Sequence, residues 1–260
     1  MRRVCGGLLK DTRMTLIATA EAARTNRKRA VAGDGMGFWH TLYLGRTRYN
    51  MAPGEADPPT GGLFPMAFLV EQDPDEVAHA HYHQADEFQV VVAGGGTLGA
   101  HSVRPVAVHF AAAHTAYGPI CAGAAGLTYL TLRNGFDPGA RYMLRAENRA
   151  ALRSVAERRH REAVGAPLRD NGTGIVLGPD PDGLGAWRYR LAPAAPLTGP
   201  APEDGAGQYW VVLAGSLQYG GATLGCLSCA FLYPDDPAFA TVAGLDGADV
   251  LVMQFPRATT

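Results

Sequence analysis

The sequence has few cysteines, almost no net charge and no long hydrophobic run. Four cysteines in 260 residues are too few for a disulfide scaffold, which favours a reducing, cytoplasmic setting. The formal net charge is −1, so no basic field points to a nucleic-acid partner. No window approaches 18 uninterrupted apolar residues, which argues against a membrane span. We therefore expect a cytoplasmic protein that binds neither nucleic acid nor membrane.

The N-terminus also lacks the apolar stretch of a secretory signal, because Lys10 and Asp11 interrupt it early. Residues 1–33 are basic and carry no strong periodic pattern. We expect them to form a poorly ordered extension. Met14 offers an alternative start codon.

Glycine and proline are abundant, with 33 and 18 residues, and they separate short apolar runs. Such runs between frequent turn signals predict an all-β fold of sandwich or barrel type. One segment differs: Arg145–Gly165 is rich in Ala, Arg, Glu and Leu and is predicted to be a helix. The expected organisation is a unit at 34–144, a linker helix at 145–166 and a second unit at 167–260.

The two β-rich units are related by a constant offset of 121 positions. Glu87–Gly94, EFQVVVAG, aligns with Gln208–Gly215, QYWVVLAG, and no gap is needed as far as Leu130 and Leu251. A single offset over this length indicates a tandem duplication of one β-barrel unit.

The first unit contains a dense group of metal-ligating residue types. His81 and His83 are two positions apart, so on a strand both side chains point to the same face. Glu87 follows after three residues and Gly94 after six more. This pattern, H-x-H-x(3)-E-x(6)-G, resembles the first motif of the cupin superfamily. The resemblance implies tandem double-stranded β-helix (jelly-roll) barrels with a metal site in the first barrel.

The second cupin motif supplies one more histidine, usually within P-x-G-x-x-H. We assign it to His114 in VHFAAAHTAYGP, where other residues replace the proline and glycine of the motif. The resemblance then implies a metal held by four residues: His81, His83, Glu87 and His114. Imidazole and carboxylate ligands suit several divalent metals. Fe(II) is favoured, with Mn, Ni, Zn and Cu as alternatives.

Other residues are assigned to the site by their alternation along the expected strands. His79 is too far from Glu87 for the motif, but by parity it shares the face of His81, where it could carry protons. His109 is read as outward-facing or packing. The remaining candidates are Tyr117 and Arg133 as catalytic residues and Gln89, Tyr129 and Thr131 as substrate-binding residues.

The second unit loses every counterpart of the proposed ligands. At the offset of 121, the four ligand positions hold Pro202, Asp204, Gln208 and Asp235. Only the first unit is therefore expected to hold a metal.

The resemblance implies a two-barrel cupin, or bicupin, with one metal site. The leading hypothesis is a mononuclear non-haem iron dioxygenase acting on a small organic substrate. The alternatives are a metal-dependent isomerase, lyase or decarboxylase, and a non-catalytic small-molecule-binding bicupin. A homodimer is expected in each case. The fold alone does not choose among these functions.

Overall fold

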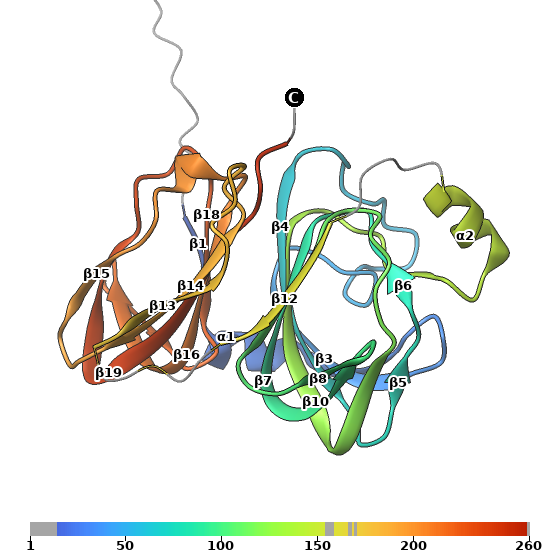
Figure 1. Cartoon of the computed structure of the whole chain (residues 1–260), viewed down its shortest axis with the longest axis horizontal. Helices are drawn as coiled ribbons and strands as arrows, with labels where there is room; N and C mark the ends of the chain where they lie inside the picture. Colours follow the sequence, from blue (N-terminus) through green and yellow to red (C-terminus); the bar gives the residue numbers. More distant parts are fainter. Residues whose placement is uncertain (1–14, 154–158, 166–167, 169–170, 259–260) are drawn as a thin grey trace, which may run out of the picture.

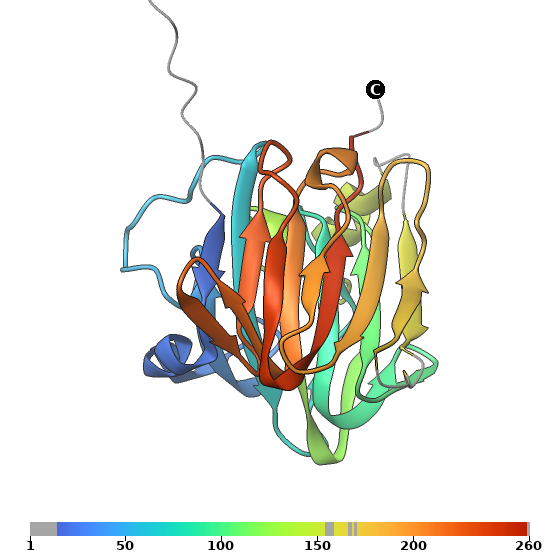
Figure 2. The ribbon, with the colours of Figure 1, turned by 90° about the vertical axis from the view of Figure 1, so that its left-hand side faces the viewer.

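Two β-barrels lie side by side, each built around one large antiparallel sheet (Figure 1). The structure is a computed structural model that describes residues 15–153, 159–165, 168 and 171–258. Turned by 90°, the sheet of the C-terminal barrel lies in front of the N-terminal barrel (Figure 2). The predicted all-β fold of two barrels is confirmed. No helix in the described part of the chain is long and apolar enough to cross a membrane.

The N-terminal barrel contains a nine-stranded sheet with the path β12-β9-β7-β10-β4-β3-β2. The seven strands of this path are β2 (Arg27–Val31), β3 (Gly37–Leu44), β4 (Leu63–Gln72), β7 (Glu87–Leu98), β9 (Ala107–Ala111), β10 (Ile120–Gly135) and β12 (His160–Val164). Four short strands complete the barrel: β5 (Val77–Ala78), β6 (His81–Tyr82), β8 (His101–Val103) and β11 (Arg141–Tyr142). The helix α2 (Ala146–Arg153) follows β11.

The C-terminal barrel contains an eight-stranded sheet with the path β1-β18-β16-β19-β14-β13. Its strands are β1 (Leu16–Ala18), β13 (Thr173–Leu177), β14 (Gly185–Leu191), β15 (Pro196–Thr198), β16 (Gln208–Tyr219), β17 (Ala222–Gly225), β18 (Cys229–Leu232) and β19 (Ala240–Gln254). A 3₁₀ turn, η2 (Pro202–Asp204), precedes β16.

The internal repeat predicted from the sequence is visible in the backbone. β7 and β16 begin 121 residues apart and have the same length. Gly94 and Gly215, which are equivalent, both have positive φ, at 70° and 67°. At either position a Cβ atom would collide with the carbonyl oxygen of a glycine on the neighbouring strand, Gly126 or Gly247. Both barrels therefore need glycine at this turn.

The alternation of β7 divides the side chains of the N-terminal barrel into two sets. Glu87, Gln89 and Val91 face the barrel interior, whereas Phe88 and Val90 belong to the hydrophobic core shared with the second barrel. The ring of Phe88 lies 5.0 Å from that of Phe255. The sheets of the two barrels thus pack against each other through their outer faces.

Two predicted segments differ from the structure. Residues 15–33 are not a disordered extension: β1 pairs with β18 of the C-terminal barrel, the short helix α1 (Ala20–Ala23) follows, and β2 pairs with β3. Residues 1–14 lie outside the described residues. The predicted linker helix is found at 146–153, residues 154–158 lie outside the described residues, and His160–Val164 forms strand β12 against β9 in place of helix.

Candidate functional site

A buried polar cluster lies inside the N-terminal barrel, where four of its strands and loops meet. His81 belongs to β6, Glu87 begins β7 and Arg133 is the register partner of Glu87 on β10. Tyr117 forms an isolated bridge with His81. None of these side chains is more than 6% exposed. We call these four residues, together with His83 and Asp137, the polar cluster.

Glu87 is held by two donors. The hydroxyl of Tyr117 donates to Oε1, and Nε of Arg133 donates to Oε2 at 2.7 Å. Burial raises the pKa of Glu87, but the charge of Arg133 and the hydrogen bond from Tyr117 are among the influences that outweigh burial, so the pKa lies below its ordinary value. Burial lowers the pKa of Arg133, and Glu87 and Asp137 raise it above its ordinary value. Glu87 and Arg133 therefore form a buried ion pair.

Asp137 fixes the orientation of His83. Its Oδ1 lies 2.8 Å from Nδ1 of His83, and its carboxylate accepts hydrogen bonds from the backbone amides of Gln84 and Gly139 at 2.7 and 2.8 Å. Nε2 of His83 lies 3.0 Å from Nη2 of Arg133. Since the guanidinium can only donate, the network assigns the proton of His83 to Nδ1 and leaves Nε2 as the acceptor.

His81 has a parallel arrangement. Its Nδ1 lies 2.6 Å from the backbone oxygen of His79, and its Nε2 lies 3.1 Å from the hydroxyl of Tyr117. Burial lowers the pKa of His81 to about 4, so the ring is neutral at pH 7. Both histidines thus turn Nε2 towards the centre of the polar cluster.

His114 does not join the polar cluster, which corrects its assignment as the fourth ligand. Its ring packs 5.8 Å from that of Tyr82, and its side chain lines a different surface pocket beside Gln84 and Asp86. The motif P-x-G-x-x-H explains the error. His114 has a φ of +62°, the conformation that suits the glycine of the motif, and Tyr117 occupies the histidine position three residues later.

His79 also lies outside the polar cluster. Its side chain is exposed, and its backbone, not its ring, contacts the site, through the carbonyl that holds His81. His79 was predicted to share the face of His81, and this prediction is wrong because β5 ends at Ala78 and β6 begins at His81. His79 and His81 therefore do not belong to one continuous strand.

The polar cluster does not fit a metal ion in the arrangement described. The guanidinium of Arg133 contacts both Glu87 and His83, and the hydroxyl of Tyr117 contacts both Glu87 and His81. The donor atoms of Glu87 and His83 are therefore engaged, and a second positive charge would lie beside the guanidinium. Among the described residues, no group of three or more His, Cys, Asp or Glu side chains has a geometry that could hold a metal.

A cavity of about 80 Å³ adjoins the polar cluster, and we call it the site cavity. The predicted wall residues Gln89, Tyr129 and Thr131 all line it, as do His81, His83, Glu87 and Arg133. Phe38, Phe68 and Val70 supply an apolar wall. Since a water molecule occupies about 30 Å³ in the liquid, the site cavity holds two or three water-sized groups.

Asp137 was missed by the sequence analysis. It follows β10 by two residues, in GFDPGA, and reads as a turn residue. Asp137 lies four residues after the inward-facing Arg133. This spacing points to Asp137 as a site residue only when Arg133 is already known to be buried. Asp137 is 2% exposed.

Of the two predicted alternatives for His109, outward-facing or packing, the structure shows packing: the ring faces the barrel interior and lies 4.6 Å from that of Tyr117. Its Nδ1 lies 3.0 Å from Oε1 of Gln89, whose amide donates to the hydroxyl of Tyr117 at 3.3 Å. Burial, followed by the charge of His160, lowers the pKa of His109 to about 3. A chain of hydrogen bonds therefore links His109 to the polar cluster.

Two buried histidines predict acid destabilisation. His40 has a pKa of about 4, lowered by burial and then by Lys28, and His109 has a pKa of about 3. Both are neutral when folded, whereas unfolded histidine titrates near pH 6.5. As the pH falls from about 6.5 to about 4, these histidines bind protons in the unfolded state but not in the folded state. The free energy of unfolding should then fall by up to about 1.4 kcal/mol per pH unit for each group.

Urea unfolding at pH 7.5, 6 and 5 measures this slope. His40→Gln should make the slope shallower, and His101→Ala should leave it unchanged, because the side chain of His101 is 68% exposed. An unchanged slope in His40→Gln would contradict the prediction.

Among its described residues, the second barrel has no equivalent polar cluster. Gln208, the counterpart of Glu87, bonds to Gln254 at 2.9 Å and to the indole of Trp210 at 2.6 Å. Asp204 and Asp235 are exposed. Instead, the second barrel forms hydrogen bonds to the backbone of the first barrel. The hydroxyl of Tyr209 donates to the backbone oxygens of Met66 and Arg133, at 2.9 and 3.1 Å.

Comparison with solved structures shows the same two-barrel fold in proteins of low sequence identity. Pirin YhhW from Escherichia coli, in complex with nickel(II), is 12% identical, with a TM-score of 0.57 over 94% of this chain and 100% of its own. A candidate dioxygenase from Nostoc punctiforme is 15% identical, with a TM-score of 0.59 over 96% and 85%. Oxalate decarboxylase from Bacillus subtilis is 8% identical, with a TM-score of 0.58 over 91% and 77%.

No family model and no curated relative matches the chain. The chain has the cupin fold, with two barrels in tandem. At these identities the likeness establishes the fold, and the function must be argued from the site itself.

Proposed function

We propose that the chain is a small-molecule-binding bicupin whose N-terminal barrel uses the guanidinium of Arg133 in the place where a metal cupin would hold its ion. The observation that carries this proposal is the engagement of Glu87 and His83 by Arg133, with a second hydrogen bond to Glu87 from the hydroxyl of Tyr117. The guanidinium supplies a fixed positive charge.

The pKa values of the polar cluster favour binding over proton transfer. A general acid or base works best with a pKa near the working pH. Here burial raises the pKa of Tyr117 well above its ordinary value, and Glu87 has a lowered pKa. Burial also lowers the pKa of His81 to about 4. These groups keep their protonation states near neutral pH and act as fixed hydrogen-bonding partners.

The charge and the volume of the site cavity determine which class of ligand it can bind. Glu87, Arg133 and Asp137 together carry one net negative charge, so a ligand that adds a further carboxylate is disfavoured. A small uncharged group with an oxygen acceptor fits the remaining Nη1 donors of Arg133 and the hydroxyl of Thr131. The cavity of about 80 Å³ admits a carbonyl or hydroxyl group with few neighbouring atoms.

A metal-dependent enzyme, with the iron dioxygenase as its leading form, is the second candidate. It is favoured by the anchoring of both Nδ1 atoms, which presents the Nε2 lone pairs that metal ligation uses. Nickel in the pirin structure agrees with this candidate. It requires Arg133 to withdraw from Glu87 and His83, and an isomerase, lyase or decarboxylase would require the same.

Metal analysis separates the two candidates. Purified under anaerobic conditions and incubated with Fe(II), Mn(II) or Ni(II), the protein should retain less than about a tenth of an equivalent of any of them after desalting. Near-stoichiometric metal that is lost in His81→Ala/His83→Ala would overturn the proposal, and substrate-dependent O₂ uptake would then test the dioxygenase.

Ligand binding is the second measurement. Acetone, as an uncharged carbonyl probe, should shift NMR resonances of the site cavity, whereas acetate should not. Thr131→Val should weaken the acetone effect, because Thr131 lines the cavity. An acetate effect larger than that of acetone would contradict the expected ligand class.

A further inference from the structure

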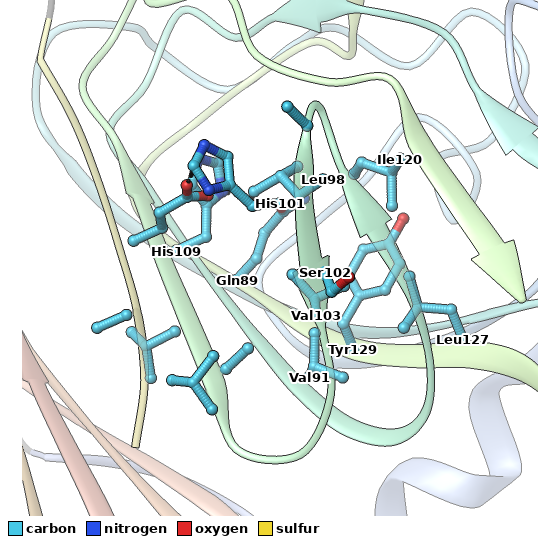
Figure 3. A pocket seen from close by; sticks show the side chains of 16 residues that line it. Gln89, Val91, Leu98, His101, Ser102, Val103, His109, Ile120, Leu127 and Tyr129 are labelled. Atoms are coloured by element: carbon cyan, nitrogen blue, oxygen red, sulfur yellow. Dashed lines mark hydrogen bonds and ion pairs between the residues drawn. The ribbon is translucent and has the colours of Figure 1, made fainter. Parts of the chain in front are cut away.

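A second and larger cavity lies in the same barrel (Figure 3), and Gln89 and Tyr129 line both this cavity and the site cavity. We call it the side cavity. Its volume is about 550 Å³, within the 300–1,000 Å³ usual for small-molecule pockets. Much of its wall is apolar, formed by Val91, Leu98, Ala107, Ile120, Leu127 and Tyr129. The exposed His101 and Ser102 on β8 lie at its mouth.

Two hydrogen-bond acceptors on this wall have no partner among the described residues. Nε2 of His109 is one, and Oε2 of Glu162 is the other. His109 is 5% exposed, and its Nδ1 proton is already donated to Gln89. Oε1 of Glu162 is paired with His101 at 3.0 Å. A buried acceptor without a donor costs free energy, so each calls for a donor from a ligand.

The sheet places these two acceptors next to each other. His109 on β9 and Glu162 on β12 are direct register partners in an antiparallel pair. Directly opposed residues have their side chains on the same face, with Cβ atoms about 4.5–5.5 Å apart. Both side chains line the side cavity. One ligand group with several donors can therefore reach both.

The charge of the wall selects the kind of donor. Glu162 is the acidic residue of the lining, and no lysine or arginine lines the cavity. Burial and His160 lower the pKa of His109 to about 3, so its ring is a neutral acceptor at pH 7. An ammonium group supplies three donors and a positive charge. A hydroxyl supplies one donor and no charge, and a carboxylate would repel Glu162.

We propose that the side cavity binds a small apolar molecule carrying a primary amine, whose ammonium donates to Glu162 Oε2 and His109 Nε2 while its hydrocarbon part packs on the apolar wall. This inference is independent of the function proposed for the polar cluster. It assigns a second ligand class to the same barrel.

Calorimetric titration with three probes of one carbon skeleton tests the assignment: 2-phenylethylamine, 2-phenylethanol and phenylacetate. The amine should bind at least about tenfold more tightly than the alcohol, since hydrogen bonds to charged groups are the stronger ones. Phenylacetate should not bind. Equal affinities, tightest binding of the acid, or no binding of the amine at millimolar concentration would overturn the proposal.

Variants locate the binding. Glu162→Gln should weaken amine binding at least about tenfold and leave alcohol binding unchanged, a difference of about 1.4 kcal/mol. Glu71→Gln is the matched control, because Glu71 is a half-buried, ion-paired carboxylate outside the cavity. His109→Leu should weaken both probes, and Ala107→Phe should abolish binding by filling the cavity. Unchanged amine affinity in Glu162→Gln would refute the proposal even if His109→Leu fails to fold.

Binding at the two cavities can be told apart. Thr131→Val alters the site cavity and should leave the affinity for 2-phenylethylamine unchanged, because Thr131 does not line the side cavity. Loss of amine binding in Thr131→Val would place the amine at the polar cluster and contradict the assignment.

Discussion

Arg133→Met is expected to lower the free energy of unfolding by about 3–5 kcal/mol, the cost of removing one partner of a buried ion pair. The variant leaves Glu87 inside the barrel with one strong donor, Tyr117, in place of two. It also removes the hydrogen bond to Nε2 of His83 and a cation 3.6 Å from Asp137. Methionine retains most of the apolar stem, so the loss reports charge and hydrogen bonding more than volume. Chemical denaturation at pH 7.5 measures the change.

The control is an exposed ion pair of the same barrel. Arg46 pairs with Glu55, and its side chain is 53% exposed. Arg46→Met should cost no more than about 1 kcal/mol. Arg133→Met/Glu87→Gln should recover part of the loss, because a neutral amide costs less to bury than an unpaired carboxylate. If Arg133→Met costs no more than Arg46→Met, the ion pair is not the element that stabilises this interior.

The sequence predicted those parts of the site that depend on local alternation. His81 and His83 share a face, and Gln89, Thr131 and Arg133 point inward as their strand parity requires. The duplication was also predicted from the sequence, because matching residues recur at one offset. In the structure, the equivalent strands β7 and β16 have the same length and the equivalent turn glycines both have positive φ. Such features depend on residues that are close in sequence or on one repeated pattern.

The errors arose where an element boundary or a long-range contact decides the outcome. His79 was placed by parity across a break between two strands. His114 was chosen by residue type and by its distance from Gly94, whereas its positive φ aligns it with the glycine of the motif and aligns Tyr117 with the histidine. His160–Val164 has the composition of a helix end, but it pairs with the exposed edge of β9 instead.

The position of the Arg133 head group had no sequence signal. Parity placed Arg133 inward, where it was predicted to be a catalytic residue. The structure instead pairs it with Glu87, its own register partner on β7. The predicted metal site and the observed polar cluster share three side chains, His81, His83 and Glu87. They differ in what lies between these side chains: a metal ion in the prediction and the guanidinium of Arg133 in the structure.

That difference predicts a gain of function. Arg133→Met/Tyr117→His should raise the affinity for Ni(II) at least about tenfold over the natural chain, or about 1.4 kcal/mol. The first change frees the donor atoms of Glu87 and His83, and the second places an imidazole at the motif position that Tyr117 occupies. Imidazole and carboxylate donors suit Ni(II). Equilibrium dialysis with metal analysis measures the affinity, and a thermal shift on adding Ni(II) confirms binding to the folded state.

Matched variants decide which side chain limits metal binding. Tyr117→His alone should bind weakly, because the guanidinium still contacts Glu87 and His83. Arg133→Met/His114→Ala should bind as Arg133→Met does, since the ring of His114 packs on Tyr82 outside the polar cluster. If His114→Ala reduces Ni(II) affinity in that background, His114 reaches the metal after all. If the natural chain already binds Ni(II) as tightly as the double variant, Arg133 does not take the place of the ion.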